Sequence, residues 1–189
     1  MKWLLTIWLI GISLILSAQK DSVYTDLSRA IQAGDSVKVL ILKKQKLSEF
    51  PVEICNLKNL QELNLSKNKI TQIPVEIAKL KQLKELNLSR NKIDSIPEEL
   101  GQLVNLKVLE LHHNSFRYLP SSIGNLKYLE YLDVDYTNLK DVPNELANCR
   151  NLNFLNIRNS YVEPETADKI RQMLPKDCVK LFPLTCNCN

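Results

Sequence analysis

Leucine and isoleucine recur at an uneven but fixed spacing through the middle of the chain. The segment LKELNLSRNKIDSIPEELGQLVN, residues 83–105, holds them at its positions 1, 4, 6, 11, 14, 18 and 21. Neither a helix of period 3.6 nor a strand of period 2 accommodates all of these positions, so the segment must combine different local structures. The same spacing begins at Leu60 and again at Leu106. A fixed period of this length predicts a solenoid of stacked coils.

Six units of 23 residues follow from this period, and they begin at Val37, Leu60, Leu83, Leu106, Leu129 and Leu152. We number repeat positions 1 to 23 from these residues. Leucines at positions 4 and 6 alternate with outward residues at positions 3, 5 and 7, which predicts a short strand with one buried face. A proline at position 15 starts a return leg that we expect to be a short helical or irregular turn. Each unit can bury its apolar edges only against its neighbours.

The pattern LxxLxLxxNxLxxLPxxIxxLxx over residues 37–161 resembles that of leucine-rich repeat proteins. It is similar to the 23-residue class found in Ras-group-related and many bacterial repeat proteins. The resemblance implies an α/β fold, a leucine-rich repeat solenoid that forms a short arc. Parallel strands would line its concave face, and helical or irregular segments its convex face. The resemblance also implies protein interaction as the usual role, although scaffolds of this kind serve many partners.

Both ends of the solenoid need a cap, and the flanking segments supply candidates. Residues 19–36 predict an N-terminal helical cap, with Thr25 or Asp26 as N-cap and Gly34 as the stop. Apolar residues on that helix would cover the first coil, namely Leu27, Ala30 and Ile31. Residues 162–189 predict a C-terminal cap made of a helix over about 165–174, a final strand through Val179 and Leu181, and a cysteine-rich tail.

The first 18 residues are a lysine followed by a mostly apolar run, which is typical of a signal peptide and short for a membrane span. Cleavage near Ala18 would leave a secreted, periplasmic or cell-envelope protein. Because Leu16 is larger than the residue usual at that place, retention as a membrane anchor is the alternative, and a membrane is expected as a partner only then. Loss of Lys2 would change the formal net charge from +4 to +3. Such a modest, interspersed charge predicts no nucleic-acid partner.

The cysteines divide into two groups. Cys55 and Cys149 occupy small or apolar repeat positions, and we interpret them as buried hydrophobic residues. In an oxidising compartment a disulfide would join Cys178 to Cys186 or Cys188, with one thiol left over. These three thiols lack the two-residue gap that is usual in zinc sites, so no metal is expected there.

Asparagine occupies repeat position 9 in three consecutive units, at Asn68, Asn91 and Asn114. The bend after each strand would otherwise bury backbone groups without partners. Because an amide both donates and accepts hydrogen bonds, we interpret these residues as a structural ladder that satisfies the bends.

Positions 8 and 10 of the first three units are basic. We call this set the basic ridge: Lys44, Lys46, Lys67, Lys69, Arg90 and Lys92. It is either a solvated face that promotes solubility or a contact surface for an acidic partner, for example an acidic glycan. The nearby Glu62 and Glu85 weaken the case for a polyanion.

Function is expected where the outward residues stop repeating. The second and third units carry nearly identical polar sets, whereas the next three units differ. We take the residues of these units as the candidate binding set: Val108, Glu110, His112, His113, Tyr131, Asp133, Asp135, Tyr136, Phe154, Asn156 and Arg158. Stacked strands about 4.8 Å apart would place Val108, Tyr131 and Phe154 side by side. Exposed aromatic residues bordered by charges favour recognition, and the alternative is that the rings pack across neighbouring strands.

The only two histidines are His112 and His113. His112 with Asp133 and Asp135 would be an incomplete metal site, and His112 with Asp135 a proton-transfer pair without a nucleophile. The chain also has only four glycines and no glycine-rich phosphate loop. We therefore expect no enzyme, metal or cofactor, and predict an exported binding module that holds a protein or peptide on its concave face. The alternative is a surface or envelope structural protein that binds acidic glycan through the basic ridge.

Overall fold

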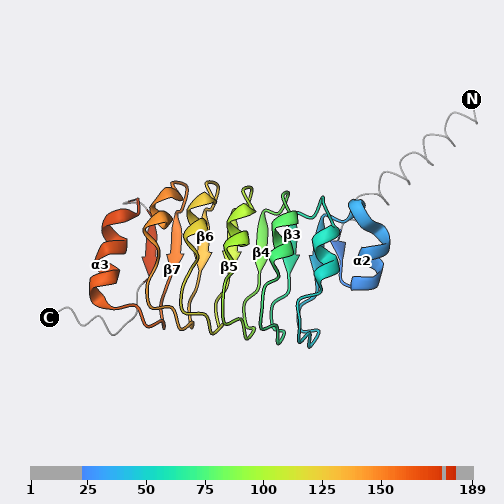
Figure 1. Cartoon of the computed structure of the whole chain (residues 1–189), viewed down its shortest axis with the longest axis horizontal. Coiled ribbons are helices and arrows are strands. Elements are labelled where there is room, and N and C mark those ends of the chain that lie inside the picture. Colours follow the sequence, from blue (N-terminus) through green and yellow to red (C-terminus); the bar gives the residue numbers. More distant parts are fainter. Residues whose placement is uncertain (1–22, 176–177, 182–189) are drawn as a thin grey trace, which may run out of the picture.

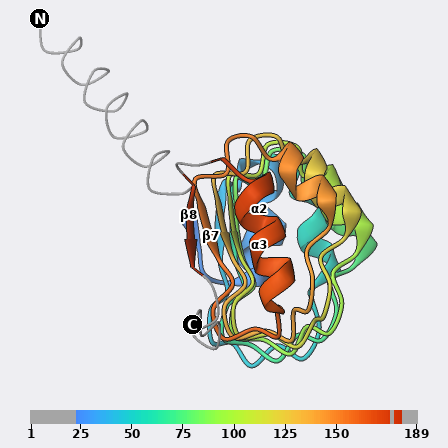
Figure 2. The same ribbon diagram turned by 90° about the vertical axis from the view of Figure 1, so that its left-hand side faces the viewer.

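The computed structural model describes residues 23–175 and 178–181. In this part of the chain eight strands, β1 to β8, form one sheet in sequence order, and each pairs in parallel with the next. The sheet forms one side of the molecule and a row of short helices forms the opposite side (Figures 1 and 2). The solenoid expected from the repeat is therefore confirmed.

Each of the six coils contributes one strand of three residues. These strands are β2 (Val39–Ile41), β3 (Glu62–Asn64), β4 (Glu85–Asn87), β5 (Val108–Glu110), β6 (Tyr131–Asp133) and β7 (Phe154–Asn156). The register pairs every strand residue with the one 23 positions later, for example Leu63 with Leu86. The sequence period is thus also the structural period. Leucines at positions 4 and 6 point inward, and Leu63 and Leu65 are fully or almost fully buried.

The return leg of each coil contains a 3₁₀ helix: η2 (Val52–Asn56), η3 (Val75–Lys79), η4 (Glu98–Gln102), η5 (Ser121–Asn125) and η6 (Asn144–Asn148). A proline immediately precedes each of them, and its restricted φ fixes where the helix begins. Neighbouring helices approach closely at position 19. A Cβ on Gly124, for example, would lie 2.4 Å from the carbonyl oxygen of Glu145.

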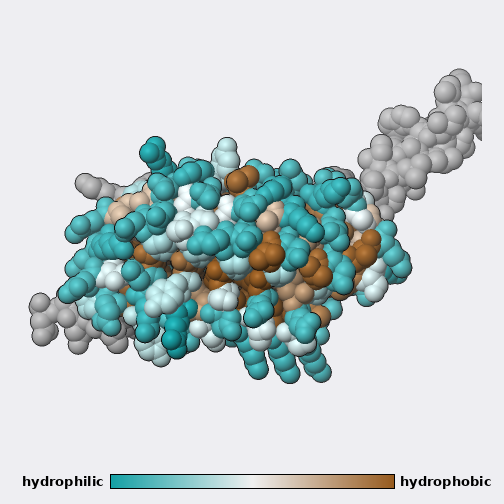
Figure 3. Space-filling model, in the orientation of Figure 1, coloured by the Kyte–Doolittle hydropathy of each residue, from teal (hydrophilic) through white to brown (hydrophobic). Residues whose placement is uncertain are grey.

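The side that carries the 3₁₀ helices is not uniformly polar. Val52 and Val75, both at position 16, are 44% and 54% exposed, whereas later coils place Glu98, Ser121 and Asn144 there. Figure 3 shows this side, and its hydrophobic surface gathers over the N-terminal half.

The asparagine ladder joins adjacent coils through hydrogen bonds. Asn91 Nδ2 donates to the carbonyls of Leu65 and Leu88 at 3.0 and 2.9 Å, and its Oδ1 accepts from the Ile70 amide at 3.0 Å. Asn68 and Asn114 make the equivalent bonds, each to its own coil and to the preceding one. Each amide therefore satisfies three backbone groups that the bend would leave without partners.

The ladder ends after the fourth coil. Position 9 is Thr137 in the fifth coil and Ser160 in the sixth, and each hydroxyl donates within its own coil, to the carbonyls of Val134 and Ile157. Among the described residues, no side chain of the fifth coil bonds to the Phe116 amide, which corresponds to the Ile70 amide. The last coils thus stack without the ladder amide; packing, strand pairing and other hydrogen bonds, such as that from Asn138 Nδ2 to the Ser115 carbonyl at 3.1 Å, hold them together.

The N-terminal end is covered by β1 (Val23–Tyr24), α2 (Leu27–Ala33) and η1 (Gly34–Ser36). Asp26 caps α2 by accepting from the Arg29 amide at 2.8 Å, and Gly34 follows the helix with φ 55°. Ala30 is buried, but Ile31 is 39% exposed, so the expectation that Ile31 covers the first coil was wrong. The strand β1 was not predicted.

The C-terminal end is covered by α3 (Pro164–Met173), whose Ala167 and Ile170 are buried, and β8 (Val179–Leu181) pairs with β7 (Figure 2). No helix among the described residues has the length and apolar character needed to cross a bilayer. Cys178 is buried. Its predicted disulfide partners, Cys186 and Cys188, and the predicted signal peptide at residues 1–18 lie outside the described residues.

Substitutions at position 9 test the ladder. Asn91→Ala leaves three backbone groups without partners, and we expect the free energy of unfolding to fall by about 2–4 kcal/mol. Thr137→Asn extends the ladder by one coil and should raise the free energy by about 1 kcal/mol. Urea denaturation followed by circular dichroism measures both changes. A Thr137→Asn chain that is no more stable than the unmodified one would contradict the assignment of the Phe116 amide as the missing rung.

Candidate binding surface

The outward side chains of the strands form columns across the sheet, and we call this solvent-facing side the sheet face. At position 3 the register places Val108, Tyr131 and Phe154 beside one another. The rings of Tyr131 and Phe154 stack with their centroids 4.5 Å apart and their planes 3° from parallel. Both are half-buried. The column therefore exists as expected, and part of its aromatic surface is used in cross-strand packing.

A second aromatic pair lies where the strands end, at position 8. His113 and Tyr136 stack with centroids 4.6 Å apart, and Tyr136 remains 54% exposed. The backbone has left the strand by this point, with φ 56° at His113 and 49° at Tyr136. This bend lets the adjacent His112 and His113 rings meet edge to face at 5.2 Å. A side chain in this left-handed region costs about 1 kcal/mol relative to glycine.

The two aromatic pairs share the fifth coil, which carries both Tyr131 and Tyr136. Among the described residues, no hydrogen-bond partner reaches the buried Nδ1 atom of His113. Burial lowers the pKa of His113, and the neighbouring Arg90 and His112 lower it further. Burial also raises the pKa of Tyr131 to about 12, and its hydroxyl donates a long 3.5 Å bond to Asp133. These rings are therefore neutral near pH 7, a property that suits contact with apolar or aromatic groups.

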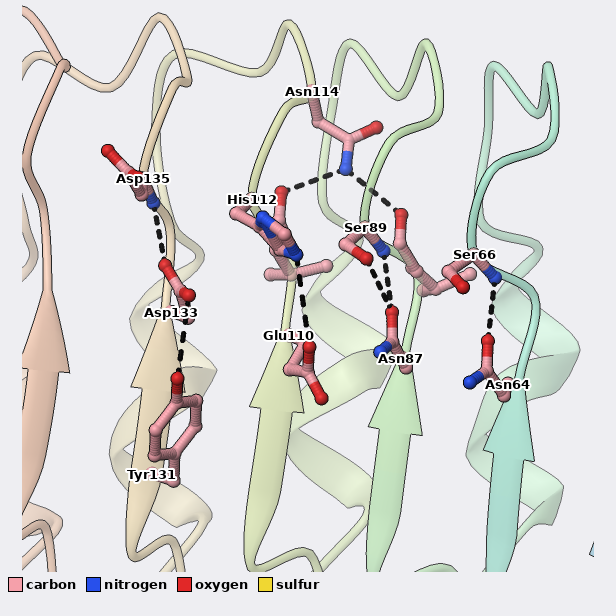
Figure 4. Close-up of polar contacts among 12 residues, drawn as sticks. Asn64, Ser66, Asn87, Ser89, Glu110, His112, Asn114, Tyr131, Asp133 and Asp135 are labelled. Carbon is pink, nitrogen blue, oxygen red and sulfur yellow. Dashed lines mark hydrogen bonds and ion pairs between the residues drawn. The ribbon is translucent and has the colours of Figure 1, made fainter. Parts of the chain in front are cut away.

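Position 5 carries a second set of structural hydrogen bonds. The side-chain oxygens of Asn64, Asn87, Asp133 and Asn156 each accept from the backbone amide two residues later, at 3.0–3.2 Å. Figure 4 shows the bonds of Asn64, Asn87 and Asp133. Asp133 and Asn156 are only 9% and 6% exposed. The Oδ1 atoms of both residues therefore stabilise the strand end, and Asp133 Oδ2 accepts from the Tyr131 hydroxyl, so a scaffold role accompanies their place in the candidate binding set. The sequence indicates this role, because asparagine or aspartate recurs at position 5.

Glu110 breaks this pattern in the fourth coil. Among the described residues no hydrogen bond joins its carboxylate to the His112 amide, and the carboxylate instead lies 3.8 Å from His112 Nε2 (Figure 4). Burial raises the pKa of Glu110; His112 opposes this shift, and the nearby carboxylates of Asp133 and Glu85 add to it. The side chain of Glu110 is longer than those at position 5 of the neighbouring coils. It therefore lacks the hydrogen bond to the amide two residues later and carries a partly buried negative charge.

Among the described residues no ion pair or hydrogen bond joins His112 to Asp135, the pair from which we expected no catalysis. The Asp135 carboxylate accepts from its own neighbour, the Tyr136 amide, at 3.0 Å and from Asn159 Nδ2 at 2.9 Å. Its oxygens are therefore turned toward the sixth coil rather than toward His112. Within residues 23–175 and 178–181 no three histidine, cysteine or acidic side chains are placed to hold a metal ion.

The sheet face also has a shallow depression that the sequence analysis missed. It has a volume of about 110 Å³ and lies over β2 to β5, where Val39, Ile41 and Asn87 line it. Of the predicted binding set, Val108 and Glu110 border it. The signal was present in the first coil, which places Val39 and Ile41 at positions where the next two coils have glutamate and asparagine.

A larger open pocket of about 680 Å³ lies at the edge of the third and fourth coils. Asp94, Glu98, Arg117 and Tyr118 contribute to its walls. The exposed Tyr118 stands at position 13, where the preceding coils have Gln72 and Ser95. Hydrogen bonds from Ser122 and Ser121 fix the Glu98 carboxylate and lower its pKa. This pocket was not predicted from the sequence.

The basic ridge lies along the edge at which the strands end, and its side chains are exposed. In the view of Figure 1 the strands point downward, and hydrophilic side chains project from this lower edge of the N-terminal coils in Figure 3. The neighbouring cations Lys44 and Lys43 lower the pKa of Lys67. The position-8 column continues from the ridge into His113 and Tyr136.

Comparison with known proteins places the chain in a family. A model described as leucine rich repeat matches residues 35–93 and 58–116, and one described as leucine-rich repeat region matches residues 92–174. The chain therefore belongs to the leucine-rich repeat family, whose members are typically interaction modules rather than enzymes. No curated protein matches it.

Solved structures share the same fold. The plant peptide hormone receptor RGFR1, in complex with RGF2, is 30% identical, with a TM-score of 0.64 over 79% of this chain and 25% of that chain. A leucine-rich repeat protein of Leptospira interrogans is 29% identical, with a TM-score of 0.55 over 82% of this chain and 51% of that chain. An internalin of Listeria monocytogenes, 22% identical, has a TM-score of 0.64 over 85% and 52% of the respective chains. The chain thus spans from a quarter to about half of these proteins.

Two substitutions at Glu110 separate its charge from its missing backbone bond. The fold raises the pKa of Glu110 above its unfolded value of about 4.3, so the folded state favours the protonated side chain. The corresponding stability is fully present below the unfolded pKa and is lost as pH rises through the folded pKa. Glu110→Gln should therefore match the unmodified chain near pH 3 and exceed it at pH 7. Glu110→Asn, which restores the acceptor for the His112 amide, should add a further increment of about 0.5–1.5 kcal/mol at both pH values.

Thermal unfolding of the three chains between pH 3 and pH 8 provides the measurement. Identical pH profiles for the unmodified chain and Glu110→Gln would show that the carboxylate is not penalised by the fold. Equal stability of the glutamine and asparagine variants would show that the backbone bond does not form.

Proposed function

We propose that this chain is an exported member of the 23-residue repeat class and acts as a non-catalytic binding module for a protein or peptide. Its N-terminal segment, residues 1–18, supports export to the cell envelope or the exterior. Ser89 occupies the same repeat position as His112 in the preceding coil, but its hydroxyl donates to Asn87 Oδ1 at 2.7 Å rather than to the His112–Glu110 pair, which supports a role without catalysis. The match to a peptide hormone receptor in complex with its ligand supports a peptide or protein as partner.

The observation that carries this proposal is the pair of aromatic stacks on the last three coils. Tyr131 with Phe154 and His113 with Tyr136 replace the glutamate and basic residues that the second and third coils have at the same positions. The rings are already fixed by stacking, so a ligand that packs on them orders few additional side chains. Aromatic residues are enriched at the energetically important centres of interfaces.

Exposed tyrosines on different edges allow a matched test. Tyr136 and Tyr161 are 54% and 66% exposed. They follow the strands of the fifth and sixth coils, at repeat positions 8 and 10. Tyr118 and Tyr128 are 60% and 56% exposed but lie elsewhere on the surface. We expect Tyr136→Ala/Tyr161→Ala to abolish capture of a specific protein from envelope and extracellular extract. The Tyr118→Ala/Tyr128→Ala chain should capture the same protein as the unmodified chain.

Quantitative mass spectrometry of the three captures gives the result. Loss of the partner only with Tyr136→Ala/Tyr161→Ala supports the sheet-face side of the last coils. Loss only with Tyr118→Ala/Tyr128→Ala would overturn the proposed surface in favour of the edge that contains the larger pocket. Equal retention by all three chains would show that exposed tyrosines do not mediate binding.

A further inference from the structure

The position-8 residues of the basic ridge form a row along one edge of the molecule. The amide of Lys44 donates to the Ser66 carbonyl at 3.0 Å, that of Lys67 to Ser89 at 2.9 Å and that of Arg90 to His112 at 2.8 Å. The three residues are thus held in adjacent coils, about 4.8 Å apart. The distance from the first to the third is about 10 Å, which an extended chain covers in three to four residues.

The cations of this ridge have no acidic partners. Within residues 23–175 and 178–181 no carboxylate lies within 4.0 Å of the charged atoms of Lys44, Lys67 or Arg90, and the same holds for the position-10 lysines. Three lysines at the opposite edge, where the strands begin, are different. Lys81, Lys84 and Lys107 each donate to a side-chain oxygen of a neighbouring coil at 3.0 Å, namely those of Gln102, Gln61 and Glu130, of which only Glu130 is acidic. Among the described residues the ridge cations make no such side-chain contact.

The local backbone does not favour basic residues at position 8. Lys44, Lys67 and Arg90 have φ of 60°, 59° and 56°, a conformation that glycine or asparagine adopts with less strain. Asn159 occupies the same position in the sixth coil with φ 51°. Close packing of like charges is also unfavourable, since Lys44 and Lys43 depress the pKa of Lys67. Folding stability alone thus does not account for three cations in this row.

The row continues without a break into an aromatic pair. His113 and Tyr136 occupy position 8 in the next two coils, and the amide of His113 donates to the Asp135 carbonyl as those of the ridge do to their neighbours. The column therefore presents three cations followed by two stacked rings, over about 19 Å from Lys44 to Tyr136. An extended segment of about six residues spans that length.

We propose that this column binds an extended acidic segment of a partner protein, with carboxylates against Lys44, Lys67 and Arg90 and an apolar or aromatic side chain on Tyr136. Charge complementarity selects the acidic part, and the rings select a peptide over a uniformly charged polymer. The inference rests on the proposed function in that the partner is a protein. Beyond that function, we assign the binding to the edge where the strands end and specify that the bound segment is acidic.

Matched triple variants of the whole chain test the column. The ridge variant is Lys44→Asn/Lys67→Asn/Arg90→Asn, which removes three charges and places residues that tolerate positive φ. The control variant, Lys81→Asn/Lys84→Asn/Lys107→Asn, removes three charges from the opposite edge. The ridge variant should keep or raise the thermal midpoint, so that a loss of binding is not a loss of folding.

The probes are two labelled peptides, Glu-Glu-Glu-Glu-Gly-Trp and its reverse, and a glutamine analogue of each, measured by fluorescence anisotropy at 150 mM salt. We expect one order of the acidic peptide to bind the unmodified chain at least tenfold more tightly than its glutamine analogue. The ridge variant should weaken that binding at least tenfold, and the control variant less than twofold. Tyr136→Ala should weaken binding of the tryptophan peptide but not of hexaglutamate.

Equal weakening by the ridge and control variants would overturn the proposal, because it would indicate attraction to net charge alone. Tighter binding of a sulfated oligosaccharide than of either peptide would also overturn it, in favour of an acidic glycan. A partner that depends on Tyr136 and Tyr161 but is still captured by the ridge variant would leave the proposed function standing and refute only this inference. Peptide binding that depends on the ridge, without any tyrosine-dependent partner, would do the reverse.

Discussion

The fold depends on satisfying the backbone where each strand turns away from the sheet. A repeat of 23 residues must reverse direction at every coil, and the bend carries amides and carbonyls into an interior that excludes water. Asn68, Asn91 and Asn114 resolve this conflict with one side chain that bonds to two coils at once. Leucine packing supplies the driving force, and the amides satisfy the bends and join each of the first four coils to the next.

A second constraint at the strand end explains the polar residues of the sheet face. Short side chains at position 5 accept from the amide two residues later, so an asparagine or aspartate there belongs to the scaffold even though its column faces solvent. Position 8 of every coil adopts positive φ. In the proposed function, residues that stabilise the strand end therefore lie between residues available to a ligand.

The repeat made the fold predictable because its main structural requirements recur from coil to coil. Strand bounds, inward leucines, the prolines before the 3₁₀ helices and the adjacency of Val108, Tyr131 and Phe154 all follow from spacing. The candidate site was less predictable because it depends on side-chain reach. The length of Glu110 sets its contact with His112, and the turn at Asp135 directs that carboxylate to Asn159. The strand β1 has two residues, too few for a periodic signal.

The end of the ladder at Asn114 divides the solenoid into two parts whose coils are joined differently. The first four coils share the ladder amides, whereas the fifth and sixth coils and α3 are joined by strand pairing, packing and individual side-chain bonds such as that from Asn138 to the Ser115 carbonyl. Repeat arrays open from their weakest interface, so hydrogen exchange in the C-terminal coils should precede exchange in the rest. The His113–Tyr136 stack crosses this seam. A partner bound to both rings would contact the two parts at once. Its binding would therefore stabilise the interface between them against local unfolding.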